Sequence, residues 1–131
     1  MEIHFKIIGV LLMALALLHL GFPAYFNWTT ELKKLNLINR QMMQVHTFFI
    51  ALTVLLMGLL CLSASTELTT TGLGKKLSFG LGVFWLIRLL IQFFGYSSAL
   101  WKGKQRETVI HIFFSLTWMY FSFCFFLAAL T

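Results

Sequence analysis

The stretch VHTFFIALTVLLMGLLCLS, residues 45–63, decides the fold, because it contains no aspartate, glutamate, lysine or arginine. A helix needs about 20 mostly apolar residues to cross the hydrocarbon core of a bilayer, which is about 30 Å thick. Residues 45–63 therefore predict a membrane-spanning helix. Further spans are expected wherever the chain on either side of this stretch contains apolar runs of similar length.

Three other apolar runs lie at residues 7–22, 77–96 and 109–130. The first run is short and reaches a spanning length only with flanking residues. The chain is 60% hydrophobic and 11% charged, whereas soluble domains are about a quarter charged. We predict an all-α integral membrane protein, an antiparallel four-helix transmembrane bundle.

We expect residues 1–131 to form a single membrane domain. Its predicted spans cover about residues 5–24, 42–63, 77–97 and 107–130. Between the first two spans, apolar residues recur every three or four positions among charged ones, which predicts a short amphipathic helix in the membrane interface. These apolar residues are Trp28, Leu32, Leu35 and Ile38.

The net charge of +6 follows from basic residues in the predicted loops. Basic loops are typical of the cytoplasmic side of membrane proteins, and this explanation is preferred to nucleic-acid binding. Six of these residues fall on one side: Lys33, Lys34, Arg40, Lys102, Lys104 and Arg106. We therefore expect both termini outside the cytoplasm, in an inner or plasma membrane. The lipid bilayer is the expected partner, with a homo-oligomer or a larger membrane complex as further options.

Three histidines are predicted at similar depth in three spans. His19 lies near the end of the first span, whereas His46 and His111 lie near the starts of the second and fourth. At about 1.5 Å of rise per residue, all three fall within about two helical turns of one interface. His46 shares a helical face with Thr53 and Met57, which we expect to point inward.

Polar residues also share faces on the last two spans. Arg88 and Gln92 are four residues apart, so they lie on one face of the third span. Arginine is costly within a membrane, so Arg88 should have an anion or a carbonyl group as its partner. A polar stripe is predicted on the fourth span, facing protein rather than lipid. It comprises Thr108, His111, Ser115, Trp118 and Ser122.

These patterns favour a metal or haem centre, because imidazole binds zinc, copper and iron. The predicted ligands are His19, His46, His111 and Glu107. The cofactor would be an iron, copper or zinc ion, or haem b, in a redox-related protein. The predicted surrounding groups are Met42, Arg40, Arg88, Gln92, Tyr96 and Ser115.

Two alternatives explain the same polar residues. In the first, they only fix the helices of a non-catalytic subunit or assembly factor, as polar contacts do in many membrane proteins. In the second, they line a binding or transport site for a quinone, a lipid or a small anion, and Arg88 favours the anion among these ligands. The aromatic residues Trp28, Tyr96 and Trp101 stand where interfacial aromatics are expected. Whether the protein is an enzyme is left open by the sequence.

Overall fold

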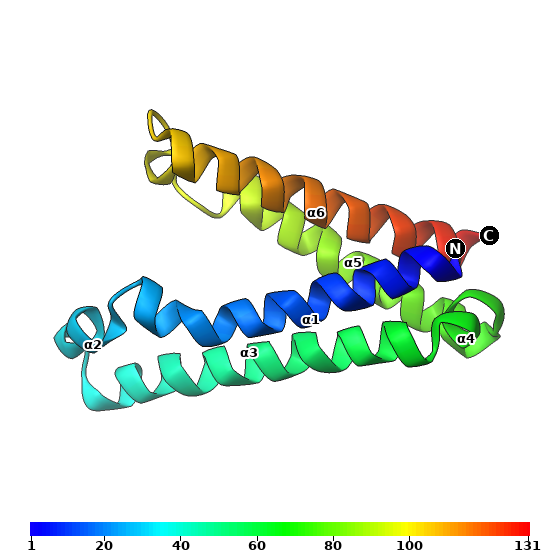
Figure 1. Ribbon diagram of the computed structural model, residues 1–131, viewed down its shortest axis with the longest axis horizontal. Coiled ribbons are helices and arrows are strands. Elements are labelled where there is room, and N and C mark those ends of the chain that lie inside the picture. Colours follow the sequence, from blue (N-terminus) through cyan, green and yellow to red (C-terminus); the bar gives the residue numbers. More distant parts are fainter. The chain divides into compact units, whose positions relative to one another are not determined.

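The computed structural model describes residues 1–131, the side chain of Ser98 excepted. Helices contain 88% of the residues, and the described chain contains no strand. The four long helices are α1 (Glu2–Tyr25), α3 (Leu37–Ser63), α5 (Gly72–Phe94) and α6 (Gln105–Leu130), shown in Figure 1. Short helices occupy the connections: α2 (Trp28–Glu31), η1 (Leu32–Lys34), α4 (Ser65–Thr70) and η2 (Ser98–Leu100).

All four long helices are long and apolar enough to cross a membrane. The predicted fold class is therefore confirmed, including a short helix between the first two spans. The boundaries differ from the prediction at α3, which begins at Leu37 rather than near residue 42. Polar residues at the start of α3 lower the hydropathy of this stretch, but they do not interrupt its helical hydrogen bonding. The Arg40 amide, for example, donates to the Asn36 carbonyl at 2.9 Å.

The described chain divides into two compact units, and the single membrane domain expected for residues 1–131 stays a prediction. Residues 3–65 form the first, in which α1 and α3 run side by side (Figure 1). Their backbones approach closely at two glycines, because a Cβ atom on Gly9 would lie 2.8 Å from the carbonyl oxygen of Gly58. Small residues allow such close packing between membrane helices.

The second unit comprises residues 66–131 with residues 1–2, and its main feature is the pairing of α5 with α6. Aromatic rings fill much of the contact. The Trp85 and Trp118 rings stack at 4.8 Å between centroids, and Phe121 meets Trp85 edge-on at 5.2 Å. These three side chains are at most 3% exposed. Because these rings are buried, the faces of α5 and α6 that carry them point toward each other. Polar residues further along the same two faces are thereby brought close together.

The start of α5 is also well defined. The Thr71 side chain caps the helix by accepting a hydrogen bond from the Gly74 amide at 2.9 Å. Further along, the buried Ser78 hydroxyl donates to the Leu68 carbonyl of α4 at 2.9 Å. These contacts start α5 five residues before the predicted boundary at residue 77, because a capped helix can include polar residues outside the apolar run.

Candidate functional site

The polar stripe predicted on α6 faces the protein interior. Ser115, Trp118 and Ser122 are buried, and Thr108 and His111 are half-buried. Hydroxyl groups of this stripe also bond within the helix, since Ser115 donates to the His111 carbonyl at 2.8 Å. The prediction of one inward face is therefore confirmed for α6.

Arg88, Gln92 and His111 form a continuous hydrogen-bonded line between α5 and α6. Nη1 of Arg88 donates a hydrogen bond to Oε1 of Gln92, with 3.2 Å between the two atoms. The Nε2 atom of Gln92 lies 2.9 Å from Nδ1 of His111. The predicted pairing of Arg88 with Gln92 is thus present, and His111 joins it across the helices.

Arg88 fixes the proton positions along this line. A guanidinium group only donates hydrogen bonds, so the oxygen of the Gln92 amide must face Arg88. The NH₂ group of Gln92 then faces His111, and Nδ1 of His111 must accept. A neutral His111 therefore carries its proton on Nε2, which is left as a hydrogen-bond donor.

The loop between α5 and α6 completes the surroundings of His111. The Trp101 ring stacks on the imidazole with 4.0 Å between centroids and an interplanar angle of 8°. The Thr108 hydroxyl donates to the Trp101 carbonyl at 2.6 Å, which ties this loop to the first turn of α6. Sequence reasoning missed this role of Trp101, because hydropathy gives an aromatic loop residue only an interfacial position.

Arg88 is surrounded by aromatic rings instead of carboxylates. Its Cζ atom lies 5.6 Å from the centroid of the Tyr96 ring and 5.4 Å from that of Trp118. Within the described residues, no glutamate or aspartate forms an ion pair with Arg88. The guanidinium charge is therefore balanced only by ring electrons and by the Gln92 oxygen.

Two buried indole N–H groups lie in the same region. In the described part of the chain, Nε1 of Trp85 and Nε1 of Trp118 are buried and have no hydrogen-bond partner. A buried donor without an acceptor costs about 1–3 kcal/mol. The groups around Arg88 thus contain a surplus of donors over acceptors.

The other predicted site residues are more dispersed. Glu107 and Met42 are exposed, Arg40 is half-buried, and Tyr96 is 45% exposed beneath Arg88. His46 is exposed, which differs from the inward position expected for it. The buried face of α3 is formed instead by Ala51, Val54, Gly58 and Cys61.

His19 occupies the position expected from its helix face. It is half-buried, and it lines a pocket together with Gln44 and Thr47 of α3. His19 and His46 belong to one unit, whereas His111 and Glu107 belong to the other. Among the described residues, no group of three or more His, Cys, Asp or Glu side chains is arranged to hold a metal ion. The metal or haem centre stays a prediction.

Comparisons with family models, curated proteins and solved structures find no match for this chain. The fold and the site thus define a class only: a helical protein with four helices able to cross a membrane and a donor-rich polar cluster between α5 and α6.

Proposed function

We propose that this chain is an integral membrane protein that binds the anionic head group of an amphiphile between α5 and α6. Arg88 and the Nε2–H group of His111 would donate to the oxygen atoms of that head group. Gln92 would hold both side chains in position. The observation that carries this proposal is the Arg88–Gln92–His111 line, whose proton positions are fixed by the arginine.

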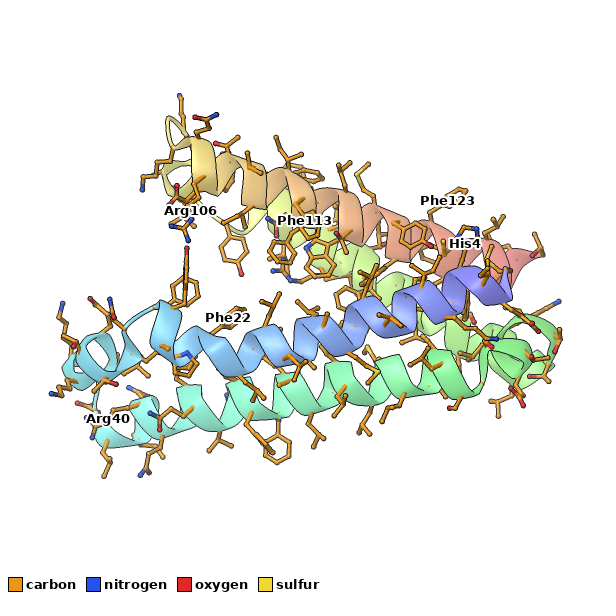
Figure 2. The ribbon with its side chains drawn as sticks, viewed as in Figure 1. His4, Phe22, Arg40, Arg106, Phe113 and Phe123 are labelled. Atoms are coloured by element: carbon orange, nitrogen blue, oxygen red, sulfur yellow. The ribbon has the colours of Figure 1, made fainter. Side chains whose placement is uncertain are left out.

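Charge supports an anion as the ligand. An arginine within a membrane span costs about 2.5–3.5 kcal/mol on insertion scales, and a bound anion offsets this cost. In the described residues the guanidinium of Arg88 has no carboxylate partner. The nearby connection carries Lys102 and Lys104, both exposed, and Arg106, which lies at this end of α6 (Figure 2). These charges attract anionic head groups from the membrane surface.

The position of Arg88 supports an amphiphile rather than a soluble anion. Arg88 lies six residues before α5 ends at Phe94, about 9 Å along the helix axis. Its guanidinium extends to the Tyr96 ring, just beyond the helix end. Phe93 and Phe94, the last two residues of α5, are exposed and apolar, as expected for a surface that contacts acyl chains.

The experiment is a thermal unfolding titration of the protein in neutral maltoside micelles. Dodecyl phosphate and dodecanoate are added separately as anionic probes, and decylubiquinone is added as a neutral carbonyl probe. A ligand at 100 times its Kd stabilises the folded state by about 2.7 kcal/mol. We expect one or both anions to raise the unfolding midpoint of the wild type, and Arg88→Gln to abolish the rise.

Lys76→Gln is the matched control, because Lys76 is an exposed basic residue in the first turns of α5, far along that helix from Arg88. It should leave the response to anions intact. A response to phosphate alone identifies a phospholipid-type ligand, and a response to carboxylate alone identifies a fatty-acid-type ligand. Stabilisation by decylubiquinone alone, or equal responses of Arg88→Gln and Lys76→Gln, would contradict the proposal.

A test of the indole donors follows from the same proposal. Trp118→Phe removes an N–H group that is buried and unpaired in the described chain. Removing an unpaired donor costs no hydrogen bond in the free protein. We expect Trp118→Phe to reduce the rise in unfolding midpoint that the anion causes. This reduction should be larger than the fall in midpoint that the variant shows without ligand.

The predicted metal or haem centre can be tested separately. Elemental analysis of the purified protein is compared with that of a His46→Ala variant. Near-stoichiometric iron, copper or zinc that is lost in the variant would support such a centre. In the structure, Nδ1 of His111 is occupied by Gln92 and its Nε2 carries the proton, so metal binding there requires loss of the Gln92 contact.

A further inference from the structure

A second polar site lies in the other unit, between α1, α2 and α3. It is a pocket of about 160 Å³ lined by His19, Leu20, Pro23, Trp28, Gln44, Thr47 and Phe48. Pockets that hold drug-sized ligands measure about 300–1,000 Å³. This pocket therefore has room for one head group or one small ring, and its mostly apolar lining leaves few positions for polar atoms.

The two best-defined polar side chains of the pocket present acceptors. Nδ1 of His19 lies 2.8 Å from the Leu15 carbonyl, which can only accept, so Nδ1 carries the proton. Nε2 of a neutral His19 then has a free lone pair. The Thr47 hydroxyl donates to the Met43 carbonyl at 2.7 Å, so its oxygen can only accept a further hydrogen bond.

Pro23 interrupts the helical hydrogen bonding of α1 next to the pocket. It lies within α1 and has no backbone N–H, so it cannot donate the helical hydrogen bond that the His19 carbonyl would otherwise accept. The carbonyl of His19 therefore lacks its usual helical partner at the place where Pro23 lines the pocket. The remaining polar groups of the lining are the side-chain amide of Gln44, which can donate or accept, and the indole N–H of Trp28, which can only donate.

We propose that this pocket binds the hydroxyl group of a neutral amphiphile. The free lone pairs of His19 and Thr47 require a donor, and a hydroxyl provides one. Leu20 and Phe48 are apolar and would contact the carbon atoms next to that hydroxyl. This proposal concerns a different unit from the anion site, and its chemistry differs: His19 and Thr47 offer acceptors to a ligand that Trp28 can also donate to, whereas the side chains beside Arg88 offer donors.

Charge favours a hydroxyl over an ammonium group as the donor. The connection next to the pocket carries Lys33 and Lys34, and Arg40 lies near the start of α3 at the same end of this unit (Figure 2). The carboxylate of Glu31 already pairs with Lys34 at 3.7 Å. The surroundings are therefore net positive, which disfavours a cationic head group.

The experiment uses tryptophan fluorescence, because bromine quenches an indole that it contacts. Trp28 lines the pocket, so its contribution is the difference between the wild type and a Trp28→Phe variant. The probe is 3-bromo-1-propanol, compared with 1-bromopropane, which lacks the hydroxyl, and with 3-bromopropylamine, which is cationic. We expect saturable quenching of Trp28 by the alcohol, at lower concentration than by either of the other two probes.

Thr47→Val and Thr53→Val form a matched pair. Both hydroxyls donate to a carbonyl four residues earlier in α3, but Thr53 is exposed and does not line the pocket. Thr47→Val should weaken alcohol binding about fivefold, the change expected for one hydrogen bond worth about 1 kcal/mol. Thr53→Val should bind the alcohol as the wild type does, in the same micelles.

His19→Leu removes the other acceptor side chain and should weaken binding of the alcohol by a similar factor, while quenching by 1-bromopropane persists. Equal quenching by the alcohol and 1-bromopropane in every variant would show simple apolar partitioning and overturn the proposal. Tighter binding of 3-bromopropylamine than of the alcohol would overturn the assignment of a neutral hydroxyl ligand.

Discussion

Gln92→Leu tests whether the hydrogen-bonded line between α5 and α6 stabilises the protein. Gln92 is 7% exposed, and it is the link between Arg88 and His111. Leucine has a similar size but can neither donate nor accept. The substitution therefore removes both contacts, while it leaves Arg88 above the rings of Tyr96 and Trp118.

The expected magnitude follows from what each partner loses. Interhelical hydrogen bonds in membrane proteins contribute about 0.6 kcal/mol on average, which is the contribution expected from the 2.9 Å contact between Gln92 and His111 alone. Nδ1 of the half-buried His111 also loses its donor, and an unpaired polar group costs about 1–3 kcal/mol when it is buried. We expect the free energy of unfolding to fall by about 1–3 kcal/mol, about 5- to 150-fold in the unfolding equilibrium.

The assay is equilibrium unfolding in mixed micelles, with Gln92→Glu as the comparison. A glutamate at this position can accept from Arg88 and also from His111, provided that the imidazole proton moves to Nδ1. Gln92→Glu should therefore retain most of the stability, and ¹⁵N chemical shifts should show the other His111 tautomer. Wild-type stability in Gln92→Leu, or an unchanged tautomer in Gln92→Glu, would refute the proton assignment.

Substitutions at Gly9, Gly21 and Thr71 test the helix contacts. Gly9→Ala places a Cβ atom 2.8 Å from the carbonyl oxygen of Gly58 and should destabilise the protein by about 1–3 kcal/mol. Gly21→Ala places a Cβ atom with no neighbouring atom within 4 Å and should stabilise the protein by up to about 1 kcal/mol. Both changes are measured by thermal unfolding. Thr71→Ala removes the cap on the Gly74 amide and should cost about 0.5–2 kcal/mol, with Thr71→Ser restoring most of the loss. Equal midpoints for the two glycine variants, or for Thr71→Ala and the wild type, would contradict these expectations.

The sequence predicts the contact between Arg88 and Gln92 and the inward stripe of α6, because polar residues in membrane helices face protein. The four-residue spacing of Arg88 and Gln92 places them on one face, and the stripe containing His111 provides the opposing group. The stacking of Trp101 on His111 depends on the conformation of the loop between the helices. Periodicity carries no information about that conformation, so this contact could not be predicted.

The rotation of α3 was harder to predict. Its polar residues His46 and Thr53 suggested one inward face, but both are exposed. The buried face of α3 follows small residues, since Gly58 packs closely against Gly9 of α1. Small side chains allow this approach regardless of where polar groups lie, and Thr53 satisfies its hydroxyl within its own helix at 2.8 Å from the Phe49 carbonyl. Polarity was therefore a weaker guide than residue size for this helix.

The pocket at His19 shows a third kind of limit. Pro23 signals an interruption of helical hydrogen bonding in the sequence, and His19 four residues earlier is the carbonyl affected. That part could be derived from spacing alone. The lining by Thr47 and Trp28 could not, because it depends on how α2 and α3 pack beside α1.

The most direct test of the proposed function is native mass spectrometry of the protein released from micelles that contain equal amounts of phosphatidylglycerol and phosphatidylcholine. The wild type and Lys76→Gln should retain the anionic lipid in preference to the zwitterionic one, because Arg88 and the Nε2–H group of His111 donate to its phosphate. Arg88→Gln and Gln92→Glu should lose that preference, since the first lacks the guanidinium and the second pairs it with a carboxylate. The same lipid preference in all four proteins would contradict an anion site at Arg88.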